Sequence, residues 1–454
     1  MKKGQILSLL PFSIFVVLTI VLSFTGSISV SLLIAVGILS IFVGAFLFRD
    51  GQAYWKTIFH YMGSPVAMTA TLLWLVVGIY GNILKEGHLV EGLVWAAQQY
   101  EVSSASFTLV VFLFSALFAF STGSGFGTIS AMSLTLFPAG VAMGGSPALL
   151  GGAILSGASF GDSIAPVSDT AIIAASTQEV DAQGRVADIG ESIRHRLPYV
   201  LTALSLSVLV FLALGYMWNQ PVGSLPVSRQ ESPEGLALLL PTFVVILLSL
   251  RKVNIFLSLF AGIVTAVILG RLLHLFTCDS LINIRNGQVS GAVVDGITGM
   301  SDICILLMVV VSLSGLVIQS GCMECFSKMV SSCSVRTSRS TDLVILSIVA
   351  MAGILIAAVN TIANICIAPF VNSIGKSLHV PPYRRTTLLA TVVCTFPFVL
   401  PYGGCALLLQ KGVETSGCTV VLQTTDIFLT AVYPWILLAV MVLSAVFHHK
   451  PSVS

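Results

Sequence analysis

The most constraining feature of the chain is a run of sixty residues, 102 to 161, that contains no Lys, Arg, Asp or Glu. Over all 454 residues only 9% are charged and 56% are hydrophobic, whereas soluble globular proteins average about 25% charged residues. Apolar runs near the ~20 residues needed to cross a bilayer recur along the chain. The sequence therefore predicts an integral membrane protein whose main partner is the lipid bilayer.

The spans are predicted to be helices, because lipid offers no partners to backbone groups and no ten-residue alternation typical of a barrel is present. We predict an all-α polytopic membrane protein with roughly ten to thirteen transmembrane helices. Polar loops are expected at 178–197 and 277–300. The predicted helical stretches lie near residues 6–24, 28–48, 64–84, 103–120, 147–177, 198–218, 235–250, 253–274, 302–321, 341–359, 361–378, 386–410 and 427–447.

Basic residues gather in short clusters between the apolar runs, as juxtamembrane anchors do. Because Lys and Arg are enriched in cytoplasmic loops, we expect a multi-pass protein with both termini in the cytoplasm. The net charge of +2 gives no reason to expect a nucleic-acid partner. The clusters used for this orientation are Lys2–Lys3, Arg49–Lys56, Arg194–Arg196 and His448–Lys450.

The charge-free run ends in GASFGDSIAPVSDT, residues 157–170, where Asp162 and Asp169 lie on either side of Pro166. A carboxylate at membrane depth costs roughly 2.5–3.5 kcal/mol or more, so it marks a functional site by default. Pro166 removes a backbone donor and breaks the helix, which leaves carbonyl groups without partners. The two acids are seven residues apart, which would place them on one face of an unbroken helix.

Hydroxyl groups surround the two acids, and oxygen ligands without thiolates suit a hard alkali cation. A partly desolvated carboxylate also holds a proton more readily, so it can bind H⁺ and Na⁺ in turn. For Asp169 alone, capping of the helix that follows is the simpler interpretation. The predicted Na⁺ ligands are Asp162, Asp169, Ser163, Ser168 and Thr170.

Residues 121–145 form a glycine-rich apolar segment that begins with STGSGFGT. Three glycines in eight residues disfavour a regular helix, so we predict a re-entrant segment. Its carbonyl and hydroxyl groups would face a substrate, with Thr122, Ser124 and Thr128 as the side chains involved. The alternative is a patch where small residues let two helices pack closely.

The second half contains a weaker version of the same pattern, a polar stretch ending in Pro followed by a helix broken at Pro. It lies in NTIANICIAP (360–369) and LLATVVCTFPFVLPYGGC (388–405). Paired breaks in two halves are typical of secondary transporters with inverted repeats, whose site lies at the bilayer midplane. We predict a first half at 1–200, connecting spans at 201–300 and a second half at 301–454, with breaks near 360–369 and 395–405. Candidate substrate contacts in the second half are Asn360, Thr361, Asn364, Thr395 and Tyr402.

Two other interpretations of the second half remain. Membrane helices contain more Gly and Pro than soluble ones, so the weaker version of the pattern need not be a repeat. The neutral polar side chains could equally form hydrogen bonds between helices.

With these motifs in hand, the sequence resembles the NhaC-type sodium/proton antiporter family. The resemblance rests on FSTGSGFGTISA, on GASFGDSIAPVSDTAIIAAS and on IRHRLPY at 193–199, and it covers about 115–200 closely. It implies a secondary transporter of the bacterial inner membrane that exchanges Na⁺ for H⁺ or couples such ions to small organic acids. Asp162, Ser168 and Asp169 are the residues that match the family motif.

The chain departs from the family pattern at residue 163. Family members carry a charged residue after the first Asp, whereas this chain has Ser163. The acid-containing stretch of the second half is absent, and NTIAN and FPFVLPYGG replace it. This leaves room for a solute carrier on the same scaffold.

We expect a Na⁺/H⁺ antiporter of the cell inner membrane, with no cofactor beyond the transported Na⁺ and H⁺. The alternative is Na⁺- or H⁺-coupled transport of a small organic acid, of the malate or lactate kind, or of an amino acid. An enzyme is not expected, because it would need a nucleophile–base pair or a metal motif, and no HExxH is present. The sequence leaves the oligomeric state open, a homo-oligomer included.

Overall fold

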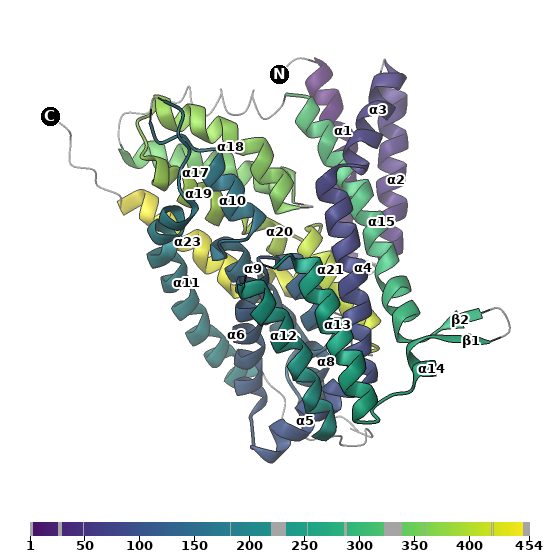
Figure 1. Cartoon of the computed structure of the whole chain (residues 1–454). Helices are drawn as coiled ribbons and strands as arrows, with labels where there is room; N and C mark the ends of the chain where they lie inside the picture. Colours follow the sequence, from purple (N-terminus) through teal and green to yellow (C-terminus); the bar gives the residue numbers. More distant parts are fainter. Residues whose placement is uncertain are drawn as a thin grey trace.

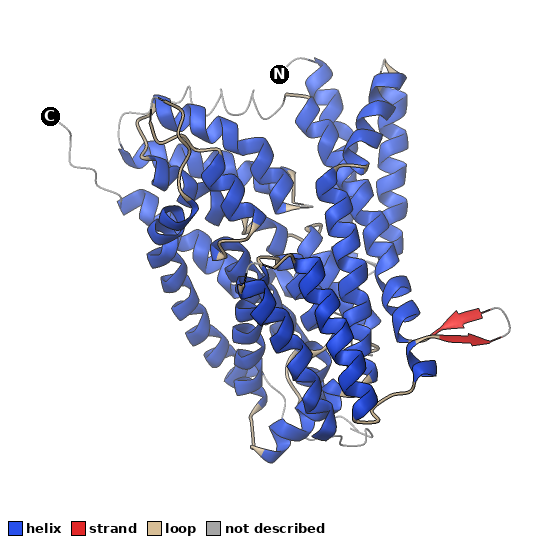
Figure 2. Cartoon of the chain, in the orientation of Figure 1, coloured by secondary structure: helices blue, strands red, loops and turns tan. Residues whose placement is uncertain are grey.

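The computed structural model of the chain is a bundle of helices with one short hairpin, shown in Figure 2. Residues 1–2, Arg49 and 448–454, which hold part of the basic clusters used to predict topology, lie outside its described residues. The structure describes residues 3–25, 30–48, 50–181, 183–218, 233–251, 253–285, 288–321, 338–357, 359–418, 420 and 422–447.

The first half of the chain folds into eleven described helices that include both predicted motifs. They are α1 (Lys3–Thr25), α2 (Val30–Leu47), α3 (Gly51–Met62), α4 (Pro65–Glu86), α5 (Leu89–Gln99), α6 (Ser104–Thr122), α7 (Gly125–Leu134), α8 (Leu136–Ala142), α9 (Pro147–Ile164), α10 (Asp169–Ser176) and α11 (Ile189–Trp218).

The rest of the chain continues as helices around an antiparallel hairpin. Ile284 pairs with Val289 across its two strands. The elements are η1 (a 3₁₀ helix, Pro233–Leu238), α12 (Leu239–Leu250), α13 (Ile255–Leu272), α14 (Cys278–Leu281), β1 (Asn283–Arg285), β2 (Gln288–Ser290), α15 (Ala292–Gln319), α17 (Ser338–Leu355), α18 (Asn360–Ser377), α19 (Pro382–Val393), α20 (Phe396–Val399), α21 (Gly404–Thr415), α22 (Thr424–Thr430) and α23 (Val432–Phe447).

Eight helices of the described chain are long and apolar enough to cross a membrane, or nine if the bent α19–α21 segment is one span. The prediction of a helical polytopic membrane protein is confirmed. The larger predicted number of spans depends on shorter apolar helices, and the inverted repeats stay a prediction. These shorter helices are Leu9–Leu22, Pro233–Ser249, Thr341–Leu355 and Val432–Phe447.

Two predicted loops are shorter in the structure than in the sequence analysis. Helix α11 begins at Ile189, because the Asp188 carboxylate accepts the backbone N–H of Glu191 at 2.9 Å and so caps the first turn. The cluster Arg194–Arg196 is therefore helical and does not lie in a loop. Helix α15 begins at Ala292, inside the predicted loop 277–300.

Small residues bring the longest helices of the bundle into close contact. A Cβ added at Gly157 of α9 would lie 2.6 Å from the carbonyl oxygen of Phe112 in α6. Gly78 of α4 and Gly296 of α15 approach each other in the same way, with each hypothetical Cβ 2.5–2.6 Å from the other's carbonyl oxygen. Close approach through small residues is how membrane helices gain packing energy.

Figure 1 shows how the elements are distributed between the two ends of the bundle. The start of α1 and the segment between α10 and α11 lie toward the upper end. Helices α5 and α14 lie at the lower end. The breaks between α9 and α10 and around α20 lie between these ends, at the depth where a transport site is expected.

Candidate cation site at the broken helices

The helix that carries the two acids is broken at Pro166. Helix α9 ends at Ile164, and Ala165 is extended (φ −60°, ψ 131°), because the residue before a proline is disfavoured in the helical region. Helix α10 then begins at Asp169, with Ser168 as its N-cap. The break predicted at Pro166 is therefore present, and the two acids lie on separate helices and not on one face of an unbroken helix.

Asp162 is the centre of a buried hydrogen-bond network. Its side chain is only 6% exposed. The Ser168 hydroxyl lies 2.7 Å from Oδ1 and 2.8 Å from the Asp162 backbone carbonyl oxygen, within reach of both acceptors. The Thr170 hydroxyl lies 3.5 Å from Oδ1. The chain therefore turns back at the break, and the hydroxyls of two predicted Na⁺ ligands, Ser168 and Thr170, lie close to the Asp162 carboxylate.

The second half of the chain completes this network. The Asn360 amide nitrogen donates to Oδ2 of Asp162, and the Cys394 sulfur lies 3.9 Å from the same oxygen. Asn364, one turn further along α18, donates to the backbone carbonyl oxygen of Thr170 at 3.0 Å. The breaks predicted in the two halves therefore meet around one carboxylate.

The glycine-rich segment approaches Asp162 with its backbone. Gly123 closes α6 in the left-handed conformation (φ 66°), and Ser124 caps α7 by accepting from the backbone N–H of Gly127. A Cβ added at Gly125 would lie 2.9 Å from the Phe398 ring and 3.5 Å from Oδ2 of Asp162. A side chain at this position would therefore displace the Phe398 ring.

The hydroxyls predicted as substrate contacts in this segment are engaged locally. Thr122 donates to the carbonyl oxygen of Phe118 at 2.9 Å, and Thr128 donates to that of Ser124 at 2.8 Å. Residues 125–142 form α7 and α8, which are together long enough to cross a membrane, so re-entrance stays a prediction.

Three helices begin at the Asp162 carboxylate, namely α7 at Gly125, α10 beside Thr170 and α18 at Asn360. The N-terminal end of a helix carries partial positive charge, which stabilises a nearby anion. This arrangement explains how a carboxylate is held in the interior of an apolar bundle.

The other predicted residues differ in how closely they approach Asp162. Asp169 is exposed, and none of the described residues bonds its carboxylate. Ser163 lies next to Asp162, but its hydroxyl faces Tyr433, with 3.1 Å between the oxygens. Tyr402 donates to the carbonyl oxygen of Ile354 at 3.0 Å. Thr361 is buried at the start of α18.

Among the predicted substrate contacts, two buried oxygen atoms have no hydrogen-bond partner among the described residues. They are Oδ1 of Asn364 and Oγ1 of Thr395. Buried polar atoms are nearly always paired in native proteins, so such atoms mark places where a water, an ion or a solute fits. Both residues belong to the second half of the chain, where the sequence predicted neutral polar contacts to a substrate.

Two residues beside this network were not among the predicted site residues, namely Cys394 next to Asp162 and Arg196 next to Ser163. Arg196 was expected in a polar loop, whereas its side chain is fully buried in α11. Its Nη1 donates to the backbone carbonyl oxygen of Ser163 at 2.9 Å. Arg196 is followed directly by Leu197, where an apolar stretch begins. This position at the edge of an apolar stretch was the sequence signal that Arg196 could be buried.

The loop that follows α10 joins the two halves at the end of the bundle where α11 begins. The ammonium of Lys376 hydrogen-bonds the Glu179 carboxylate and lowers the pKa of that group. Arg385 donates to the backbone carbonyl oxygen of Glu179 at 2.6 Å. These contacts hold α10 against α18 and so keep Thr170 near Asn360.

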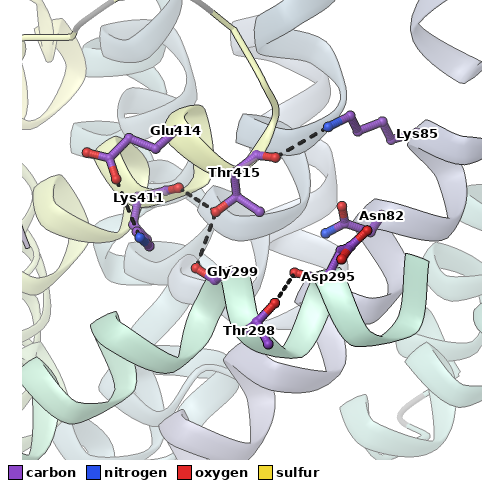
Figure 3. Close-up of a pocket in the computed structure, with 8 residues that line it drawn as sticks. All are labelled: Asn82, Lys85, Asp295, Thr298, Gly299, Lys411, Glu414 and Thr415. Carbon is purple, nitrogen blue, oxygen red and sulfur yellow. Dashed lines mark hydrogen bonds and ion pairs between the residues drawn. The ribbon is translucent and has the colours of Figure 1, made fainter. Parts of the chain in front are cut away.

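A polar cavity of about 400 Å³ lies between the end of α4, the start of α15 and the end of α21 (Figure 3). Lys411 pairs with Asp302 at 3.2 Å and with Glu414 at 3.5 Å. Lys85 donates to the carbonyl oxygen of Thr415 at 3.4 Å. The cavity lies apart from the Asp162 network and shares no lining residue with it.

Comparison with known proteins gives relatives of one kind. The chain is 26% identical to the malate-2H⁺/Na⁺-lactate antiporter of Bacillus subtilis, over 68% of each protein. It is 29% identical to the Na⁺/H⁺ antiporter NhaC of Alkalihalophilus pseudofirmus, over 43% of this chain and 40% of that protein. The matches thus span about two thirds of the first relative's length and two fifths of the second's.

Among solved structures, the YdaH transporter of Alcanivorax borkumensis resembles the chain with a TM-score of 0.44 and 14% identity, covering 88% of this chain and 89% of that one. A score this low does not establish a shared fold. The model of the Na⁺/H⁺ antiporter family matches residues 1–216, which hold α1 to α10 and most of α11. Residues 1–216 are thus similar to the Na⁺/H⁺ antiporter family.

Proposed function

We propose that the protein exchanges Na⁺ for H⁺ across the membrane and that Asp162 is the carboxylate that binds the two ions in turn. The observation that supports this most is the convergence of both halves of the chain on one buried carboxylate. In secondary transporters the coupling ion binds where broken helices of two halves meet. An exchanger of this kind needs such a group, and the described residues place no second acid in the same network.

The chemistry follows from the ligands around Asp162. Its two carboxylate oxygens, with the hydroxyls of Ser168 and Thr170, form an oxygen-rich set suited to a hard monovalent cation. A proton on the carboxylate removes the negative charge that attracts Na⁺. Binding of H⁺ and binding of Na⁺ therefore exclude each other, and that exclusion couples their movements in opposite directions.

Asn360 is expected to position the carboxylate for the cation. A hydrogen bond to a charged group contributes about 1.5–3 kcal/mol, so Asn360→Ala should raise the Na⁺ concentration for half-maximal exchange about tenfold. Dye-based measurement of ΔpH in everted vesicles over a Na⁺ series tests this. Asn254→Ala, which removes an exposed N-cap of α13, is the matched control. An unchanged Na⁺ dependence in Asn360→Ala would contradict the role.

Asp169 should contribute far less than Asp162, because it is exposed and begins α10. We expect Asp169→Asn to keep most of the exchange activity, with a loss of a few fold that reflects a weaker helix start. The same vesicle assay measures it beside Asp162→Asn. Equal inactivity of the two variants would show that both acids bind the ion.

A second candidate function is ion-coupled transport of a small organic acid. It is favoured by the malate/lactate antiporter among the relatives and by the unpartnered oxygens of Asn364 and Thr395. Counterflow in proteoliposomes with malate, lactate and amino acids tests it. Solute uptake that is weakened by Thr395→Ala more than by Asn254→Ala would support this candidate, and no uptake of any solute would exclude these substrates.

We further propose that the protein lies in the cell inner membrane with both termini in the cytoplasm. The exposed Arg194 and His195 at the start of α11 support this orientation, since Lys and Arg mark cytoplasmic segments. Reporter fusions after residues 55, 190 and 454 should all report a cytoplasmic position. A periplasmic signal from any one of them would overturn the orientation at that point.

A further inference from the structure

Arg196 is a charged group buried in a membrane-spanning helix beside the candidate site. Its side chain is fully buried, and only Nη1 has a described hydrogen bond, to the carbonyl oxygen of Ser163. Nε and Nη2 are buried without a partner among the described residues. A guanidinium is always charged in proteins, and a buried charge is costly unless another charge balances it.

The balancing charge is not a direct ion pair, because none is described for Arg196. Its ionisable neighbours Cys394 and Tyr433 are uncharged near neutral pH in their ordinary states. The carbonyl group that Arg196 binds belongs to Ser163, which follows Asp162 directly. Standard bond lengths therefore place the Asp162 carboxylate within about 13 Å of the guanidinium.

We propose that Arg196 is a positioning residue that acts as the fixed counter-charge of the cation site. It would hold the carbonyl end of α9 and balance Asp162 when that carboxylate carries neither Na⁺ nor H⁺. Once Na⁺ is bound, the same charge repels it and favours its release. This role rests on the proposed function of Asp162 and adds to it the group that sets the affinity.

The size of the effect follows from electrostatics. Two unit charges at this upper limit of about 13 Å, with an effective dielectric constant near 20, change a binding constant about tenfold, and a shorter separation gives a larger effect. Loss of the charge should therefore strengthen Na⁺ binding by about that factor. Release should slow at the same time, so the maximal rate falls while the half-saturating Na⁺ concentration also falls.

The experiment compares Arg196→Gln, Arg196→Met and Arg196→Lys in proteoliposomes, with Na⁺ varied at a fixed alkaline pH. The two neutral variants should show half-saturation at about tenfold lower Na⁺ and a lower maximal rate. Arg196→Lys keeps the charge and should stay within about twofold of the unchanged protein. Arg194→Gln, which removes an exposed charge from the same helix, is the matched control and should change neither quantity.

A purely structural cap would reduce the amount of folded protein without changing the Na⁺ dependence. Unchanged half-saturation in an active neutral variant, or equal behaviour of the Lys and Gln variants, overturns the proposal. A loss of activity confined to exchange driven by an organic acid also overturns the proposal, because Arg196 would then be a ligand for a substrate carboxylate.

If neither neutral variant inserts, Arg196→Gln combined with Asp162→Asn should restore insertion, because both buried charges are then gone. If the double variant does not insert either, the proposed role of Arg196 is also overturned.

The two proposals fail in different ways. If Asp162→Asn keeps the normal Na⁺ response, the proposed function of the site is wrong. If Asp162→Asn is inactive and Arg196→Gln has normal Na⁺ dependence, only the role of Arg196 is wrong.

Discussion

Asp162→Asn is expected to abolish exchange of Na⁺ for H⁺ while leaving insertion and folding intact. The amide cannot take up or release a proton, and it lacks the charge that attracts the cation. It keeps the size of the side chain and can still accept from Ser168, so the break between α9 and α10 should hold. Dye-based ΔpH measurement in everted vesicles should show no response to Na⁺. Loss of a hydrogen bond to a charged group alone costs about 1.5–3 kcal/mol, which is about 10- to 150-fold, and the loss of the proton-binding group adds to this.

Asp279→Asn is the matched control for this variant. Asp279 is exposed in the first turn of α14, and its replacement should leave exchange unchanged. Normal Na⁺-dependent proton movement in Asp162→Asn, at equal amounts of protein in the membrane, would contradict the assignment of the site.

Gly157→Ala is expected to have the second-largest effect, through packing and not through chemistry. The added methyl group would lie 2.6 Å from the Phe112 carbonyl oxygen, 2.6 Å from Ser115 Cβ and 2.7 Å from the Ala116 nitrogen. Two of these are backbone atoms of α6, so the helices must separate. Overpacking of this kind typically costs about 1–3 kcal/mol, and α9 holds Asp162 in place. Both the folded fraction and the exchange rate should fall.

Thermal stability in detergent, followed by fluorescence-detected size exclusion, measures the effect of Gly157→Ala. Gly51→Ala is the control, since an added Cβ at Gly51 meets nothing within 4 Å. Equal melting temperatures for the two variants would show that α6 and α9 are not packed as the structure has them.

The sequence could predict Asp162 and its hydroxyl neighbours because each carried a local chemical signal. A carboxylate in a charge-free run is costly, and a nearby proline makes a break, so both features can be read without a structure. The same reasoning selected Asn360, which lies in the second half and donates to Asp162. Polar groups in apolar helices are few, so each one is informative.

The geometry beyond the break could not be predicted from spacing. The one-face arrangement of Asp162 and Asp169 assumed an unbroken helix, and Pro166 itself makes that assumption fail. The local bonds of Thr122 and Thr128 are equally invisible in the sequence, because a hydroxyl in a helix can turn to its own backbone.

Arg196 was misplaced because the cluster of three basic residues was treated as one unit. Arg194 and His195 are exposed and pair with Glu191, whereas Arg196 points into the bundle. Neighbouring residues of a helix face different directions, so adjacent charges need not share surroundings. The start of α11 had to be known before the three could be separated.

The central claim, that Na⁺ and H⁺ compete for the Asp162 carboxylate, is tested most directly by proton release on Na⁺ binding. Na⁺ is added to purified protein in weakly buffered detergent solution, and the protons set free are recorded with a pH-sensitive dye. The unchanged protein should release protons in proportion to the Na⁺ bound, and Asp162→Asn should release none. Proton release of the same size from Asp162→Asn, or Na⁺ binding without release in the unchanged protein, would contradict it.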